Sequence, residues 1–223
     1  MNQDRVMQSG VRAGELSTNK VLRNTYMLLS LTLLFSALTA SISMMLQVGI
    51  AGYWIAFGAG FITLLVLPKF ADRMAGLALT FLFTGLLGFA LGPILNTYVT
   101  MLSNGAEIVM MALGGTGVIF LGLSGYALTT RKDFSFLQGF LMVGILLAVV
   151  ASFATLFFNV PAFSLALSGV FVLLMSGLIL FQTSQIIHGG ETNYILATVN
   201  LYVALYNLFL SLLHILAAFA GER

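Results

Sequence analysis

The sequence predicts an all-α integral membrane protein, a bundle of seven transmembrane helices. Of its 223 residues, 60% are hydrophobic and only 7% are charged, whereas a soluble domain carries about a quarter charged residues. The apolar residues form unbroken runs of about 18 to 27 residues, and a helix needs about 20 residues to cross a bilayer. Since backbone polar groups find no water partners inside a bilayer, these runs must be helical.

The seven apolar runs follow one another with short interruptions. Pro68 ends the second run, which is the shortest, and only the segment "NVPA" at 159–162 divides the fifth run from the sixth. An odd number of spans and the lack of an internal repeat argue against two equal halves. We therefore expect one membrane domain over 25–220. The predicted spans are 25–48, 50–67, 74–98, 105–129, 136–158, 163–187 and 194–220.

A polar tail, residues 1–24, precedes the first span. Its first twenty residues, "MNQDRVMQSGVRAGELSTNK", show no apolar stripe of helical period, so we expect much of this tail to be irregular and flexible. A cleaved signal peptide would place a short apolar core close to residue 1. The tail is therefore expected to be retained.

The basic residues predict the orientation of the chain. Eight of the nine fall on one side of a seven-span arrangement, and Lys and Arg near span ends are retained in the cytoplasm. The N-terminus is then cytoplasmic and the C-terminus periplasmic. Acidic residues are mixed among the basic ones, so the sequence pI of about 9.0 reflects topology rather than nucleic-acid binding. The eight residues are Arg5, Arg12, Lys20, Arg23, Lys69, Arg73, Arg131 and Lys132.

Two spans carry glycines on one helical face. Such faces let transmembrane helices approach closely, so both are predicted to be packing surfaces. They consist of Gly85, Gly88 and Gly92 on the third span, and Gly115, Gly122 and Gly125 on the fourth.

A polar segment, "FQTSQIIHGGETNY" at 181–194, interrupts the two last apolar runs. The two glycines can end a helix in left-handed geometry, and Thr192 or Asn193 can cap the next helix. This loop interpretation leaves Gln182 and Gln185 unexplained, because both lie inside the sixth span. The candidate loop comprises His188, Gly189, Gly190, Glu191, Thr192 and Asn193.

The seventh span has one polar face. Its members recur at helical spacing, and polar groups in a membrane favour the bundle interior, so we expect this face to point inward, towards Gln182 and Gln185. Two interpretations stay open: hydrogen bonds that hold helices together, or a hydrated conduit. The face consists of Asn200, Ala204, Asn207, Ser211 and His214.

Catalysis has no support in the sequence. The chain has no cysteine, no HExxH and no intramembrane pair of aspartates, which would activate a nucleophile or a water. His188 and His214 are predicted at opposite ends of their helices, so a shared metal is not expected. We predict neither an enzyme nor a cofactor or metal site.

Several motifs resemble the Bax inhibitor-1 family over residues 17–219. They are "NKVLRNTY" at 19–26, "LGPILNTY" at 91–98, "MALGGTGVIF" at 111–120, "LTTRKDFSFL" at 128–137, "IIHGGETNYILATVNLY" at 186–202 and "LYNLFLSLLHIL" at 205–216. The resemblance implies a seven-helix bundle with a cytoplasmic N-terminus, in agreement with the basic residues.

The resemblance implies two activities of different kinds. Bacterial members bind the membrane protease FtsH and restrain its degradation of inner-membrane proteins such as the translocon subunit SecY. Other members are pH-sensitive calcium leaks governed by two facing aspartates, whose places are taken here by Gln182 and Ala204, while His214 replaces the family's arginine. Neither an amide nor a methyl group can share a proton or bind calcium as a carboxylate does. We therefore favour the FtsH regulator, with FtsH and membrane lipids as partners, and keep the calcium leak as the alternative.

Overall fold

The computed structural model describes residues 3–155, 157 and 160–221, with side chains from Thr18 onward within these ranges. Seven long helices fill this part of the chain, which contains no strand, and each has a segment long and apolar enough to cross a membrane. The seven predicted spans are confirmed, and the chain is a multi-pass membrane protein. The elements are α1 (Gln3–Met45), α2 (Ile50–Val66), the 3-10 helix η1 (Leu67–Phe70), α3 (Met74–Met101), α4 (Gly105–Thr130), α5 (Leu137–Ala154), α6 (Pro161–Ile187) and α7 (Tyr194–Gly221).

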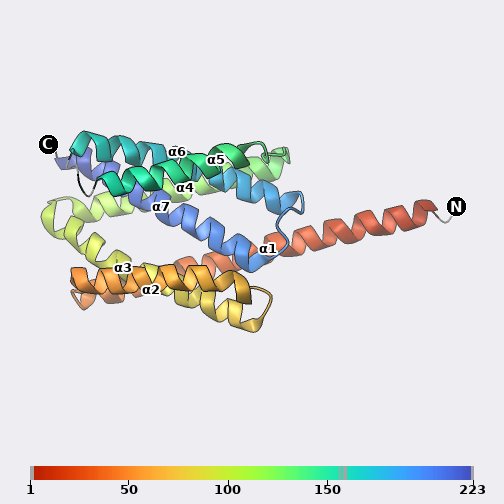
Figure 1. Cartoon of the computed structure of the whole chain (residues 1–223), viewed down its shortest axis with the longest axis horizontal. Coiled ribbons are helices and arrows are strands. Elements are labelled where there is room, and N and C mark those ends of the chain that lie inside the picture. Colours follow the sequence, from red (N-terminus) through yellow and green to blue (C-terminus); the bar gives the residue numbers. More distant parts are fainter. Residues whose placement is uncertain (1–2, 156, 158–159, 222–223) are drawn as a thin grey trace.

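The N-terminal tail differs from the expectation of irregular structure. α1 is one continuous helix of 43 residues, of which Thr18–Met45 is the membrane-spanning part, and its first turns project beyond the bundle (Figure 1). Propagation adds a hydrogen bond for each residue fixed, so a helix already formed in the membrane extends readily into a segment without proline. The flexibility of this segment stays a prediction.

The helices form two layers with α7 between them (Figure 1). α3 packs on α1 and α2 in one layer, and α6 packs on α4 and α5 in the other. α7 contacts α1 and α3 on one side and α4 and α6 on the other, so this helix lies in the middle of the bundle. α5 lies at the edge and turns apolar side chains outward, among them Phe140, Met142, Leu146 and Val150.

The glycine face of α3 is a close contact with α1, as predicted. A Cβ on Gly88 would overlap the carbonyl oxygen of Ser36 and the hydroxyl of Thr39, and a Cβ on Gly92 would overlap Ser43. At these positions α1 and α3 touch through their backbones, as small residues allow.

The glycine face of α4 is not such a contact. A Cβ on Gly122 or Gly125 would meet nothing within 4 Å, and one on Gly115 would only reach ordinary contact with Leu212 at 3.5 Å. The packing prediction for α4 is therefore wrong, because this helix turns a different stripe towards α6 and α7. That buried stripe consists of Gly105, Ile108, Ala112, Thr116, Phe120, Ser124 and Ala127.

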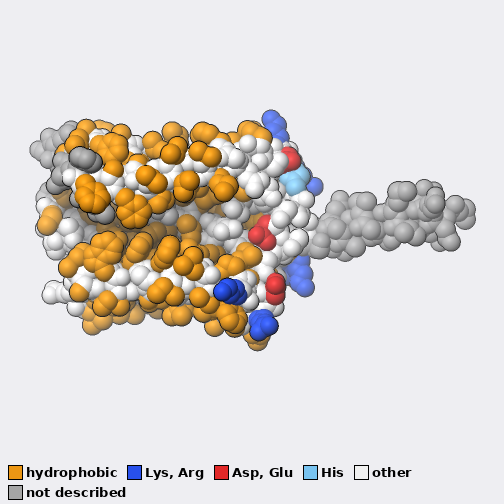
Figure 2. Space-filling model, in the orientation of Figure 1, with side chains coloured by type: hydrophobic (Ala, Val, Ile, Leu, Met, Phe, Trp, Pro, Cys, Tyr) orange, Lys and Arg blue, Asp and Glu red, His pale blue; other side chains and the backbone are white. Residues whose placement is uncertain are grey.

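Charged side chains gather at one end of the bundle, around the α2–α3, α4–α5 and α6–α7 loops (Figure 2). We call this the charged end. Apolar side chains cover the sides of the molecule, where lipid would lie. The charged end includes Lys69, Asp72, Arg73, Arg131, Lys132, Asp133 and Glu191, with His188 beside them.

Candidate functional site

The α6–α7 loop closes as its glycines predict. Gly189 has a left-handed backbone with φ of 74°, and the N–H groups of Gly190 and Glu191 both donate to the carbonyl oxygen of Gln185, at 2.8 and 3.1 Å. A Cβ on Gly190 would overlap the Gln185 side-chain oxygen. The first glycine supplies the turn that ends α6, and the second leaves room for Gln185 against the loop.

Asn193 is the cap of α7. Its Oδ1 accepts hydrogen bonds from the N–H groups of Ile195 and Leu196 at 2.9 and 3.2 Å, which satisfies two donors of the first turn. Its Nδ2 donates to Asp72 Oδ1 at 2.8 Å. One side chain therefore starts α7 and ties the loop to the α2–α3 connection.

Replacing Asn193 by alanine should lower the free energy of unfolding by about 1 to 2 kcal/mol, because the cap and the bond to Asp72 are both lost. Thr192→Ala is the matched control, since the Thr192 side chain is exposed and has no hydrogen bond within the described chain. Unfolding by a denaturing detergent measures both. Equal stability of the two variants would contradict the capping role.

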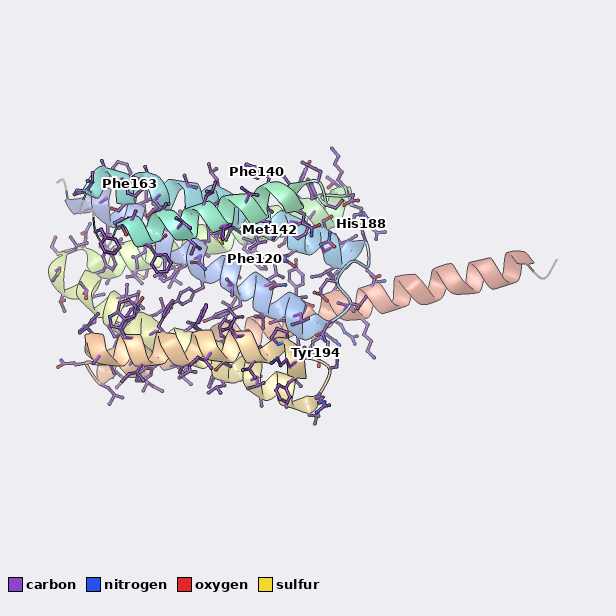
Figure 3. The ribbon with its side chains drawn as sticks, in the orientation of Figure 1. Phe120, Phe140, Met142, Phe163, His188 and Tyr194 are labelled. Atoms are coloured by element: carbon purple, nitrogen blue, oxygen red, sulfur yellow. The ribbon has the colours of Figure 1, made fainter. Side chains whose placement is uncertain are left out.

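His188 joins the same loop to the α4–α5 connection. Its Nε2 lies 3.1 Å from the carbonyl oxygen of Arg131, and its Nδ1 lies 2.9 Å from that of Ser184. The Ser184 hydroxyl in turn accepts from the Phe134 N–H at 3.0 Å and donates to the Lys132 carbonyl at 3.3 Å. The α6–α7 loop is thus bonded to both other loops of the charged end. Figure 3 labels His188 in this loop and Tyr194 at the start of α7.

The α4–α5 connection has an ordered turn of its own. The Ser135 N–H donates to Asp133 Oδ1 at 2.8 Å. This hydrogen bond, with help from the Ser135 side chain and from nearby His188, holds the pKa of Asp133 below its ordinary value. Asp133 therefore stays ionised at the exposed charged end.

The polar face of α7 is only partly buried and is not one connected site. Three of its five members lie on the less buried stripe of the helix. Ala204 and Ser211 are buried, and Asn200, Asn207 and His214 are half-buried. Asn207 Nδ2 donates to the Val203 carbonyl of its own helix at 2.9 Å. His214 Nδ1 pairs with Ser168 Oγ of α6 at 2.8 Å, which is the interhelical bond that one interpretation expected.

Gln182 and Gln185 of α6 are half-buried, and within the described chain no hydrogen bond joins either side chain to the polar face of α7. Their neighbours Thr183 and Ser184 are fully buried. Thr183 Oγ1 lies 3.4 Å from Tyr26 Oη and 3.5 Å from Ser124 Oγ. Sequence analysis missed this cluster because isolated hydroxyl residues are common in apolar helices.

A second buried cluster was also missed. The Ser36 hydroxyl lies 2.6 Å from Tyr202 Oη, which donates to the Thr84 carbonyl at 3.2 Å. Three helices, α1, α3 and α7, meet at this tyrosine, which is 1% exposed. The only signal in the sequence is a tyrosine in the middle of a span, away from the interfaces that tyrosine favours.

A cavity of about 460 Å³ lies between α1, α3, α4 and α7. Hydroxyls of Ser36, Ser41, Thr116, Tyr202 and Tyr206 are its only side-chain polar groups, and no charged or amide side chain lines it. Such a lining offers a cation no anionic ligand. In the described part of the chain, no group of three or more His, Asp or Glu side chains is placed to hold a metal ion.

Comparison with known proteins covers almost the whole chain. A family model described as inhibitor of apoptosis-promoting Bax1 matches residues 18–221. The modulator of FtsH protease YccA of Escherichia coli K12 is 51% identical over 214 residues, which cover 96% of this chain and 97% of that protein. An uncharacterized membrane protein of Vibrio cholerae is 48% identical over 90% of each chain. An uncharacterized protein of Pseudomonas aeruginosa is 44% identical over the full length of both.

Proposed function

Because this chain belongs to the Bax inhibitor-1 family, we propose that it is a bacterial inner-membrane regulator that binds the FtsH protease and restrains its degradation of membrane proteins such as SecY. The observation that carries this proposal is the 51% identity, over nearly the full length of both chains, to a protein named as a modulator of FtsH. A second relative with the same identity is named an inner membrane protein.

The proposed orientation places the charged end in the cytoplasm. Its basic side chains support this, because Lys and Arg near span ends are retained on the cytoplasmic side. The projecting start of α1 lies at the same end (Figure 1). The C-terminus of α7 then lies in the periplasm.

Reporter fusions check this orientation. A periplasm-active reporter fused after Arg223 should be active, and the same reporter inserted in the α4–α5 connection beside Asp133 should be inactive. The reverse pattern would refute the proposed topology.

The proposed mechanism is competition by a substrate that is slow to extract. The projecting start of α1 is the handle by which the protease engages the chain. Further pulling must expose the apolar faces of seven packed helices, at about 25 cal/mol per Å². The loop bonds of His188 and Asn193 hold the charged end together, so the protease meets a packed bundle directly after the handle.

A pulse-chase experiment tests this function. Overproduction of the full-length chain should lengthen the half-life of SecY several-fold in cells with active FtsH. A chain lacking residues 2–15 should be degraded more slowly itself and should protect SecY less, because the handle is gone. Lys20 and Arg23 remain to hold the orientation.

Cells that lack FtsH activity are the control, and there the two chains should have the same half-life. An unchanged SecY half-life with the full-length chain would refute the function. If the two chains had equal half-lives and protected SecY equally, residues 2–15 would not be the segment by which FtsH engages the chain, and the proposed function would stand.

A further inference from the structure

The cavity between α1 and α4 is a groove open towards the lipid. One face of α1 and one face of α4 form its walls, with α3 and α7 behind them. Ala37 on α1 and Leu113 on α4, which is 56% exposed, lie at its mouth. The α1 wall runs from Leu33 to Met44 and the α4 wall from Val109 to Phe120. Each is about 16 Å long at 1.5 Å per residue.

Small residues make up much of both walls, and they let a helix backbone approach closely. A Cβ on Gly117 would meet nothing within 4 Å, so the α4 wall stands open where it would touch a partner. These small residues are Ser36, Ala37, Ala40 and Ser41 on α1, with Thr116 and Gly117 on α4.

Tyr206 places an unpaired hydroxyl in this groove. Its side chain lines the groove and is only 8% exposed, yet its Oη has no hydrogen-bond partner in the described part of the chain. The neighbouring Tyr202, by contrast, is paired with Ser36 and Thr84. This hydroxyl is reachable from the groove, and lipid tails offer it no acceptor, so an occupant with a hydrogen-bond acceptor at this depth would gain a bond there.

The depth of Tyr206 distinguishes a protein helix from a lipid. It lies 12 residues (206 − 194) after the start of α7 and 15 residues (221 − 206) before its end, or roughly 18 and 22 Å along the axis. This is the middle of the membrane. Phospholipid polar groups stay at the interface, roughly 15 Å from the middle of a 30 Å core, whereas a transmembrane helix can carry a serine, threonine or amide there.

We propose that the groove between α1 and α4 binds a transmembrane helix of FtsH whose mid-span polar group accepts a hydrogen bond from Tyr206. This inference rests on the proposed function and gives it a contact surface. A helix is about 10 Å wide, so it lies across the mouth and inserts side chains into the 460 Å³ groove.

Photo-crosslinking in cells that produce FtsH tests this surface. A benzophenone amino acid is placed at Ala37 or Leu113, at the groove, or at Leu146 of α5, which is 64% exposed and lies outside it. Recovery of FtsH with the intact chain is measured in parallel. Adducts with FtsH are expected at Ala37 and Leu113 and not at Leu146.

Two variants probe the contact in the same assay. Gly117→Leu fills the groove and should lower the adduct yield about tenfold. Tyr206→Phe removes the hydroxyl and should lower it about threefold. Tyr126→Phe, at an exposed tyrosine on α4 outside the groove, is the matched control and should leave the yield unchanged.

The other outcomes separate the inference from the proposed function. If FtsH is recovered with the chain but its adducts form only at Leu146, or not at all, the groove is the wrong surface while the function stands. Groove adducts with phospholipid or with a second copy of this chain, in place of FtsH, also overturn the inference. If FtsH is not recovered, the proposed function fails together with it.

Discussion

Replacing Gly88 by alanine is expected to lower the free energy of unfolding by about 3 kcal/mol, the upper part of the range for an overpacked core. The new Cβ would overlap the backbone carbonyl of Ser36 and the hydroxyl of Thr39. A backbone atom cannot turn away as a flexible side chain can, so α1 must shift relative to α3. That shift also disturbs the Ser36 bond to Tyr202.

Gly122→Ala is the matched control for this prediction. It makes the same chemical change in a transmembrane helix, but its Cβ meets nothing within 4 Å. Alanine favours a helix over glycine by about 1 kcal/mol, so the control should be neutral or slightly stabilising. Thermal unfolding of the purified proteins in detergent measures both. If the two variants were equally stable, α1 and α3 would not be in backbone contact.

The second large expected effect is on calcium flux, and it tests the alternative function of a calcium leak. We expect purified protein in lipid vesicles to show little acid-dependent calcium flux, because Gln182 and Ala204 stand where the family resemblance expects two aspartates. The double variant Gln182→Asp with Ala204→Asp should introduce pH-dependent flux if the two positions face each other. A calcium-sensitive dye inside the vesicles reports the flux.

The double variant should also become less stable as the pH rises. Ala204 is fully buried, where a carboxyl group is tolerated in its neutral form but is costly in its charged form. The variant therefore loses stability as the pH rises and the new carboxyl group ionises. A charged aspartate in mid-membrane costs about 3 kcal/mol.

Gln182→Asn with Ala204→Ser is the control, since it adds polarity without a carboxyl group. It should show neither the flux nor the pH-dependent loss of stability. Strong acid-dependent flux in the unmodified protein would contradict this account and restore the leak as a function.

Local signals in the sequence determined the spans and the turn between the last two. An apolar run of membrane length allows only a helix, because no other backbone arrangement satisfies its polar groups in lipid. Gly189 and Asn193 act within a few residues of themselves, one by its left-handed backbone and the other by capping the next two N–H groups. Such features depend on neighbours in the chain and can be read from it.

Only the tertiary structure decided which residues of each span meet. Gly88 and Gly122 lie in similar sequence patterns, yet one touches a backbone and the other faces open space. Tyr202 meets a serine 166 residues away, and Tyr206, one turn further along, opens into a groove. In a membrane the lipid-facing and the buried faces of a span are both mostly apolar, so the hydrophobic pattern that orients a soluble helix is weak. The rotation of each helix follows from close packing against its neighbours, which are distant in the sequence.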